Sequence, residues 1–175
     1  RVLHHAIFRI LYPLFDKGFI FDSYSCRVNK GTHRAVNRLA KFSLKSSCNN
    51  RDLIFALKCD IRKFFASINQ DILLRLIAKK IQDENSIWLI EEIIRSFFQG
   101  LPLGNVTSQL FANIYLSELD QFVKHKLKVK YYLRYCDDFI ILSQDKEYLE
   151  NLILLIDNFL NKMKLIWTDI TLRKR

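Results

Sequence analysis

The sequence predicts an α+β fold in which an antiparallel sheet has helices packed on one face. Segments with the 3.6-residue apolar period of helices alternate with short aromatic and β-branched runs that are typical of buried strands. Two of these runs, 131–135 and 139–142, lie so close together that they predict a hairpin. The 175 residues contain no internal repeat and no low-complexity linker, so we expect a single compact domain.

The same periodicities place the elements along the chain. The run LIFALKC, at 53–59, lacks glycine and proline and is followed by an acid, so it predicts a strand. The hairpin at 131–142 supplies two more strands, and the end of the chain, LIWTDITLRKR, is expected to be irregular. Helices are expected at residues 2–14, 31–46, 69–81, 86–98, 106–127 and 146–163.

The positive charge of the chain is concentrated near its beginning. The net charge is +10; residues 1–63 hold 13 Lys and Arg against 4 Asp and Glu, whereas residues 64–175 hold 15 against 14. Because like charges four residues apart destabilise a solvated helix, an unbalanced basic stripe favours contact with a polyanion, and nucleic acid is preferred to an ordinary basic surface. This stripe lies in a span without acids and consists of Lys30, Arg34, Arg38, Lys41 and Lys45.

Apolar and cysteine content narrow the class of protein. Half of the residues are apolar and only two are proline, as in an ordered globular chain. The run LILLI, at 152–156, is far too short to cross a membrane, so no membrane partner is expected. The four cysteines form no C-x-x-C pair, which favours a reduced, cytoplasmic protein over disulfides or a zinc site. The first residue is Arg1 rather than Met, which suggests truncation.

Three aspartates are expected to meet where the strands end. Asp60 follows the strand at 53–59, and Asp137 and Asp138 lie at the turn of the hairpin. Placed side by side, the strands would bring three repelling carboxylates together with few basic groups to pair them. Each acid alone is more often a cap or a turn residue. Together with the basic stripe they favour Mg²⁺ or Mn²⁺, and two such ions serve phosphoryl transfer on nucleic acid.

A glycine-containing loop is the third feature of the sequence that indicates function, after the basic stripe and the three aspartates. In GLPLGNVTSQLFANIYLSELD, at 100–120, Gly100 and Gly104 precede a helix and allow close approach of a ligand to the backbone. The order D-x-x-x-x-F, G-x-x-x-S-Q and Y-x-D-D resembles the palm of a reverse transcriptase, and FDSYSCRVNKGTHRA, at 21–35, is similar to the fingers motif of that family. The resemblance covers about residues 1–165. It implies a right-hand polymerase palm with partial fingers and with the thumb missing.

The resemblance implies a catalytic metal site. Asp60, Asp137 and Asp138 would be the catalytic residues. Asp60 and Asp137 would bridge two Mg²⁺ ions, for which Mn²⁺ is a possible substitute. The backbone carbonyl of Ile61 would be a further ligand and Asp138 a looser one. One ion would lower the pKa of the primer 3′-hydroxyl, and the other would neutralise the triphosphate.

The resemblance also implies residues that contact the substrates. Arg27 and Lys30 would grip the triphosphate, although the neighbouring Val28-Asn29 departs from the family pattern. Phe65 would exclude a ribose 2′-hydroxyl, with core packing as the alternative. The full set implied to contact the nucleotide is Arg27, Lys30, Phe65, Leu103, Gly104 and Gln109, and the set for primer and template is Tyr135, Arg34 and Arg38.

Two residue pairs in the loop favour one subfamily. Most reverse transcriptases carry Gln-Gly and Ser-Pro where this chain has Leu103-Gly104 and Ser108-Gln109. The latter pairs resemble the reverse transcriptases of diversity-generating retroelements in bacteria and phages. That resemblance implies error-prone copying of a template RNA into cDNA that diversifies a target gene, from a primer and dNTPs. It also implies a possible basic accessory variability determinant protein as partner.

The resemblance also implies a division into fingers and palm, and two alternative functions stay open. Residues 1–50 would be part of the fingers, and residues 51–175 would form the palm with inserted fingers helices at about 71–99, truncated at both ends. One alternative is a reverse transcriptase of group II intron or retron type, against which the Leu103 and Gln109 pattern argues. The other is a non-catalytic, truncated RNA-binding remnant, which the three intact aspartates disfavour and the missing thumb keeps open.

Overall fold

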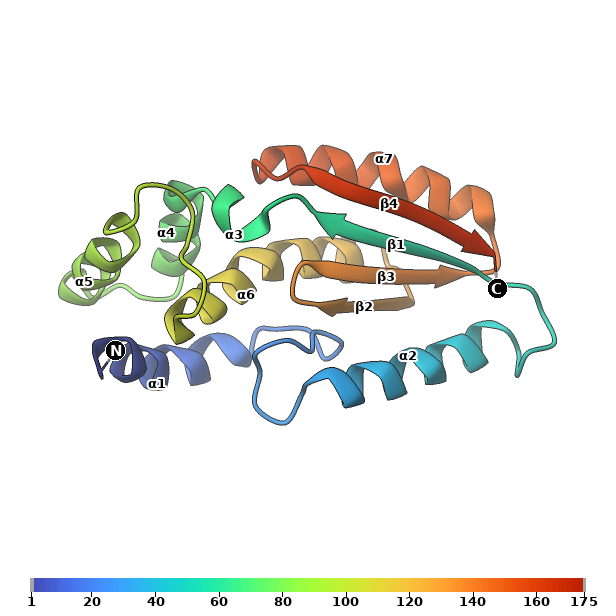
Figure 1. Cartoon of the computed structure of the whole chain (residues 1–175), viewed down its shortest axis with the longest axis horizontal. Coiled ribbons are helices and arrows are strands. Elements are labelled where there is room, and N and C mark those ends of the chain that lie inside the picture. The colour runs from blue at the N-terminus through green and yellow to red at the C-terminus, as the bar shows by residue number, and fades with distance from the viewer. Residues whose placement is uncertain (1, 175) are drawn as a thin grey trace.

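The computed structural model describes residues 2–174 and has a four-stranded sheet with helices around it (Figure 1). It confirms the predicted α+β class; the end residues of the expected domain ranges, Arg1 and Arg175, lie outside the described residues. The elements are α1 (Val2–Asp16), α2 (Thr32–Ser46), β1 (Phe55–Ile61), α3 (Phe64–Ser67), α4 (Gln70–Ala78), α5 (Glu84–Arg95), α6 (Val106–Gln121), the π-helical turn η1 (Phe122–Lys126), β2 (Tyr131–Tyr135), β3 (Asp138–Ser143), α7 (Lys146–Lys162) and β4 (Trp167–Lys174).

The sheet has the order β2-β3-β1-β4, and every neighbouring pair is antiparallel. The hairpin strands β2 and β3 follow the prediction, and β1 lies beside β3 as expected. The prediction of an irregular end was wrong, because residues 167–174 form β4 and pair along the whole of β1. The segment carries a weak local pattern of its own, and the ladder partners that β1 offers decide its conformation.

The main core lies between one face of the sheet and the helices α6 and α7. Leu57 and Cys59 from β1 and Tyr132 and Ile141 from the hairpin are fully buried in it. Helix α6 is buried on nearly all sides, as expected for a helix through the centre of a domain. Figure 1 shows α6 and α7 behind the sheet, so this face carries the helical layer that the sequence predicts.

A smaller core lies on the opposite face of the sheet, where α2 packs across the hairpin. Phe42 of α2 contacts Tyr131 with ring centroids 5.5 Å apart, and Leu133 and Leu142 are buried in the same cluster. The helix covers β2 and β3 only in part. The side chains of Lys58 and Asp138, which lie on this face, stay about half exposed. The face therefore offers an open area beside the carboxyl end of β1.

Capping residues set the starts of three helices; α4 and α5 begin at residues 70 and 84 where the prediction gave 69 and 86, whereas α7 begins at residue 146 as predicted. Asn69, Asp83 and Asp145 each accept a hydrogen bond from the backbone of the first turn of α4, α5 and α7. Of the helices in the described part of the chain, none is both long and apolar enough to cross a membrane. The cysteines are all free thiols, and Cys26 and Cys48 are exposed.

Candidate active site

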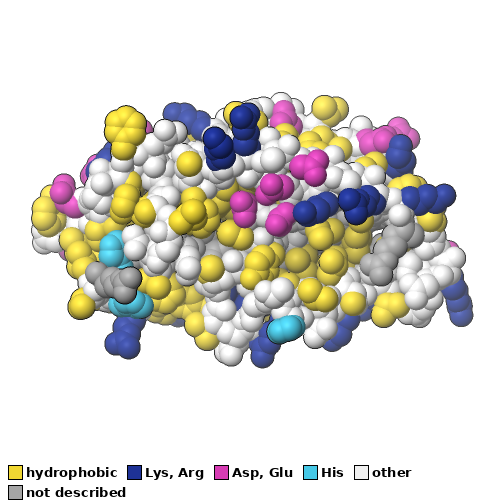
Figure 2. Space-filling model, viewed as in Figure 1, with side chains coloured by type: hydrophobic (Ala, Val, Ile, Leu, Met, Phe, Trp, Pro, Cys, Tyr) yellow, Lys and Arg dark blue, Asp and Glu magenta, His cyan; other side chains and the backbone are white. Residues whose placement is uncertain are grey.

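The three predicted aspartates come together on the open face of the sheet. In the antiparallel β1–β3 ladder Cys59 lies opposite Phe139, so the same register places Asp60 across from Asp138 on the adjacent strand. Asp137 lies in the tight turn between β2 and β3, which Tyr135 and Asp138 close as a ladder pair. All three aspartates are half-buried. Figure 2 shows acidic side chains gathered near the centre of this face, with basic side chains beside them.

The electrostatics of the cluster favour a cation. Burial raises the pKa of Asp60 above its ordinary value, and the charges of Asp138 and Asp137 raise it further. Lys58 is one cation close to the group, with its Nζ 3.3 Å from Oδ1 of Asp138. Its side chain is half exposed, so it offsets only part of the repulsion.

The donor set fits a hard divalent ion that is shared with a substrate. Within residues 2–174, no three His, Cys, Asp or Glu side chains already surround one point as a metal cage would require. Mg²⁺ is usually held by one or two carboxylates together with substrate phosphates, and it retains several waters. Carboxylate oxygens from adjacent strands, on an open face, suit that mode of binding.

A fully buried arginine holds the turn that carries Asp137. The side chain of Arg134 is 1% exposed, and its Nη1 donates to the carbonyl oxygen of Cys136, 2.8 Å away. Cys136 has a φ of 57°, a left-handed conformation that is uncommon for a residue with a side chain. The hydrogen bond to its carbonyl fixes that conformation, and the two aspartates that follow are placed by it.

The other donors of Arg134 connect the turn to two parts of the fold, helix α6 and the 21–31 loop. Nε and Nη2 donate to both carboxylate oxygens of Asp120 in α6, at 2.8 and 2.7 Å. The remaining N–H groups donate to Asn113 Oδ1 and Ser23 Oγ, so all five donors of the guanidinium are used. Burial acts to lower the pKa of Arg134, but the charge and hydrogen bonds of Asp120, together with Tyr132 and Cys136, raise it above its ordinary value.

The sequence interpretation missed Arg134 and Asp120. A signal was present, since Arg134 interrupts a buried aromatic run and Asp120 lies near the end of a largely apolar helix. A charged residue is almost never fully buried without a partner. It also missed Asp169, an exposed acid that β4 places opposite Asp60 in the ladder, because that segment was expected to be irregular.

Three of the cations predicted to contact nucleotide, primer or template are engaged by groups in and around the 21–31 loop. Nε of Arg27 donates to Asp16 at 2.7 Å and its Nη1 donates to two backbone carbonyls, so the guanidinium is nearly buried rather than directed to solvent. Nζ of Lys30 donates to the carbonyl of Phe21 at 2.6 Å. Arg38 forms an ion pair with the buried Asp22 at 2.8 Å.

The basic stripe therefore contributes less free positive charge than the sequence suggested. Arg34 also donates to a backbone carbonyl of the same loop, that of Asn29. Lys30 precedes α2, which begins at Thr32, so the stripe is not one continuous helical face. Lys41 and Lys45 remain exposed on α2.

The glycine-containing loop is anchored beside Phe65. A Cβ on Gly100, at φ 63°, would lie 2.3 Å from the carbonyl oxygen of Phe65, and the backbone of Leu101 donates to that same oxygen at 2.8 Å. The loop then projects outwards: Leu103 is 78% exposed, and open space surrounds Gly104, at φ 91°. The loop is therefore packed against the backbone of Phe65 at Gly100, whereas its apex at Leu103 and Gly104 faces solvent.

The structure brings some of the predicted contact residues to the turn and leaves others apart. Phe65 and Gln109 line one narrow crevice together with Cys136. Within the described residues, the side chain of Gln109 makes no hydrogen bond. Tyr135 is partly exposed at the end of β2, and its hydroxyl lies 3.0 Å from Thr32 Oγ1 at the start of α2.

Comparisons with known proteins agree with this arrangement. The sequence model of the family described as reverse transcriptase (RNA-dependent DNA polymerase) matches residues 1–169. The chain is 27% identical to the group II intron-encoded protein LtrA of Lactococcus lactis over 75% of the chain and 22% of LtrA. It is 24% identical to the protein YkfC of Escherichia coli over 72% of the chain and 35% of that protein. The chain thus spans about a third or less of these relatives.

Solved structures show the same fold. Apo telomerase from Candida tropicalis superposes with a TM-score of 0.73 over 97% of this chain and 36% of the telomerase chain, at 14% identity. The telomerase of that organism in complex with a fragment of telomeric RNA gives a TM-score of 0.71 over 97% of the chain and 33% of the telomerase chain, at 16% identity. At these identities the likeness concerns the fold, and it confirms the predicted polymerase-type α+β class.

The buried pair yields a test of stability. Arg134→Met leaves the carboxylate of Asp120 buried without its partner, and we expect a loss of about 3–5 kcal/mol in the free energy of unfolding. Asp120→Leu should cost a similar amount. The double variant should lose much less than the sum, because an apolar pair replaces two buried charges. Urea unfolding of the four proteins measures this coupling.

A surface pair gives the matched control. Lys146 and Glu150 form an ion pair at 2.8 Å with both side chains about half exposed. Lys146→Met should change stability by less than about 1 kcal/mol. Additive losses for Arg134→Met and Asp120→Leu would contradict the interpretation of the pair as one coupled unit.

Proposed function

The chain belongs to the reverse transcriptase family, and we propose that it forms the catalytic part of an RNA-directed DNA polymerase. The observation that carries the proposal is the meeting of Asp60 and Asp138, on adjacent strands, with Asp137, in the hairpin turn, on an open sheet face. The raised pKa of Asp60 supports it, because uncompensated carboxylates bind a divalent cation favourably. The partners of this activity would be template RNA, a primer or cDNA strand and dNTPs.

In the proposed mechanism Asp60 and Asp137 would hold two Mg²⁺ ions. The carbonyl of Ile61 is a further candidate ligand, and Asp138 contributes charge at the edge of the site. When bound, such ions activate the primer 3′-hydroxyl and stabilise the charge of the triphosphate and the departing pyrophosphate. Arg134 acts behind the acids: it touches no substrate and holds the turn in the conformation that presents Asp137.

Substrate selection is proposed for the residues around the acids. Phe65 lies in the crevice beside the hairpin turn, where its ring would exclude a ribose 2′-hydroxyl. Tyr135, on the exposed edge of the turn, would contact the primer end. Lys30 would need to leave the carbonyl of Phe21 to reach a triphosphate. Because the guanidinium of Arg27 is nearly buried, we propose for it the role of holding the 21–31 loop in place.

The remaining predicted residues keep proposed roles at the edge of the site. Leu103 and Gly104, at the exposed loop apex, would flank the base and sugar of the incoming nucleotide. Gln109 lies in the crevice with Phe65. Arg34 and Arg38 would contact primer or template. We propose the same division as before, with fingers at 1–50, palm at 51–175, and α4 and α5 as inserted fingers helices.

The finer proposal is a diversity-generating retroelement enzyme of a bacterial or phage-encoded, cytoplasmic system. The Leu103-Gly104 and Ser108-Gln109 pairs support it. A basic accessory protein is then a proposed partner, and adenine-directed errors are the proposed property. The second candidate is a group II intron type, which the similarity to LtrA favours. A template and variable repeat pair beside the gene would support the first candidate, whereas a surrounding intron RNA would support the second.

Asp137→Asn should abolish Mg²⁺-dependent primer extension on an RNA template. The variant should fold, because loss of one carboxylate relieves repulsion in the metal-free cluster. Mg²⁺ should raise the melting temperature of the unaltered protein and raise that of Asp137→Asn less. Glu147→Gln, which removes an exposed acid at the first turn of α7, is the control for charge alone. Extension near the normal rate in Asp137→Asn would refute the metal site.

Phe65→Ala should let ribonucleotides into the product while deoxynucleotide use stays largely intact. The substitution opens space beside the sugar without adding a bond. Extension assays with each nucleotide class measure the selectivity, and thermal unfolding measures stability. Unchanged selectivity with a stability loss of about 3–5 kcal/mol would assign Phe65 to core packing instead.

Leu103→Gln should lower misincorporation opposite template adenine by roughly two- to tenfold. Gln adds a donor and an acceptor beside the incoming nucleotide, and one net hydrogen bond is worth about 0.5–1.5 kcal/mol. The exposed loop apex should accept the substitution without loss of stability. Sequencing of cDNA copied from a defined RNA by both enzymes measures the error rate. Equal rates at adenine would leave Leu103 without a role in fidelity.

A further inference from the structure

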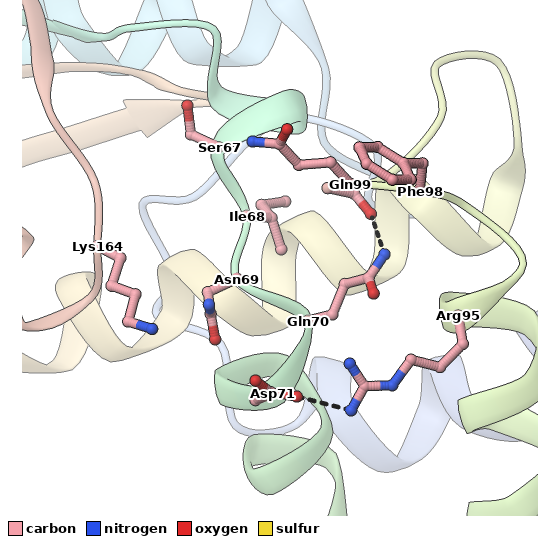
Figure 3. A pocket seen from close by; sticks show the side chains of 10 residues that line it. Ser67, Ile68, Asn69, Gln70, Asp71, Arg95, Phe98, Gln99 and Lys164 are labelled. Carbon is pink, nitrogen blue, oxygen red and sulfur yellow. Dashed lines mark hydrogen bonds and ion pairs between the residues drawn. The ribbon is translucent and has the colours of Figure 1, made fainter.

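A second site is suggested by a cavity of about 430 Å³ that none of the three aspartates lines. It lies between the α3–α4 connection, the end of α5 with the loop that follows, and the turn that leads from α7 into β4 (Figure 3). Its volume is within the range of small-molecule sites in proteins. Three separate segments of the chain line this cavity.

Two cations stand on opposite sides of this cavity. Figure 3 shows Lys164 on one side and Arg95 on the other, with the backbone of residues 67–71 between them. Lys164 is exposed, and within residues 2–174 its Nζ forms no ion pair. Arg95 pairs with Asp71 at 2.6 Å and with Glu91 at 3.4 Å, so its charge is partly offset. The lining is therefore mildly positive, and the cation without a partner is the lysine.

An aromatic ring stands at the rim without apolar cover. Phe98 is 104% exposed, which is an unfavourable position for a large apolar side chain. Its loop is nevertheless held firmly, because Nε2 of Gln70 donates to the carbonyls of Ile94, Phe97 and Gly100 at 3.0, 3.0 and 3.1 Å. A ring on a fixed loop is a preorganised surface for a flat ligand, since little ordering is required when the ligand stacks on it.

The polar groups of the lining suit the edge of a nucleobase. The amide of Gln99 is exposed and makes no hydrogen bond within the described residues, so it offers both a donor and an acceptor. Asn69 uses its Oδ1 to cap α4 and keeps its Nδ2 as a donor. Aromatic, amide and cationic groups in one cavity match the stacking face, the edge and the phosphates of a nucleotide.

We propose that this cavity binds one nucleotide of a single-stranded RNA. Its base would stack on Phe98, its edge would meet the amide of Gln99, and the phosphates on its two sides would face Lys164 and Arg95. A strand is favoured over a free nucleotide because a strand carries a phosphate on each side of the base, whereas a free nucleotide carries them at one end only. The inference rests on the proposed function in one respect, that the strand is the template.

The test is the affinity of the complete protein for a short, fluorescently labelled single-stranded RNA. Phe98→Ala should weaken binding by about tenfold through lost stacking. Lys164→Gln should weaken binding and lower the slope of log affinity against log salt by about 0.7, the value for one phosphate contact on a single strand. Both side chains are exposed, so both variants should melt at the normal temperature.

Matched controls come from the helices that precede Phe98 and Lys164. Trp88→Ala removes an exposed aromatic of α5 outside the cavity, and Lys162→Gln removes the exposed lysine that ends α7. Both should bind RNA as the unaltered protein does. Normal RNA affinity in Phe98→Ala and Lys164→Gln would overturn the proposal. A raised KM for dNTPs with unchanged RNA affinity would also overturn it and would assign the cavity to a free nucleotide.

The same assay separates this inference from the proposed polymerase activity. Asp137→Asn should bind the labelled RNA normally, because Asp137 does not line the cavity. If the unaltered protein fails to extend a primer while Phe98→Ala and Lys164→Gln still lose RNA affinity, the polymerase proposal fails and the RNA subsite stands. The reverse pattern refutes the subsite alone.

Discussion

The ion pair between Arg134 and Asp120 is the constraint on which the geometry of this fold depends. It lies between the hairpin, the central helix α6 and the 21–31 loop, and both side chains are almost wholly buried. Burial of two charges costs several kcal/mol per ion, which good geometry and full hydrogen bonding must offset. Here every donor of the guanidinium is used. An apolar pair could provide comparable stability but could not fix the carbonyl of Cys136, so the pair is best explained by positioning.

The rigidity of this frame explains how repelling acids can persist at the turn. Burial and the charges of Asp138 and Asp137 raise the pKa of Asp60, which means that the ionised, metal-free site opposes folding. The turn cannot relax away from Asp60, since Arg134 holds it from behind and the β1–β3 ladder holds it from the side. The repulsion between the carboxylates therefore persists in the metal-free protein, and binding of a cation would relieve it.

The sequence predicted correctly those elements whose conformation is determined by neighbouring residues. The hairpin, the strand character of β1 and the extent of α2 follow from periodicity and turn chemistry over a few residues. Long-range pairing decided the rest. Residues 167–174 become a strand because β1 offers a ladder, and Arg27 turns inwards because Asp16 lies beside it in space. Arg134 and Asp120 likewise meet through the packing of β2 on α6, so the residues adjacent to each of them in the sequence do not indicate that they pair.

The exposed loop is informative about function for a physical reason. A buried residue such as Ser108 is constrained by packing whatever the protein does. The likeness to telomerase at 14% identity shows that very different sequences can form the same fold. Leu103 is 78% exposed at the loop apex, where an aliphatic side chain gains little from the core. Packing therefore gives no reason for its identity, and contact with a ligand gives one. The residues that specify the substrate of this fold are accordingly expected among such exposed positions.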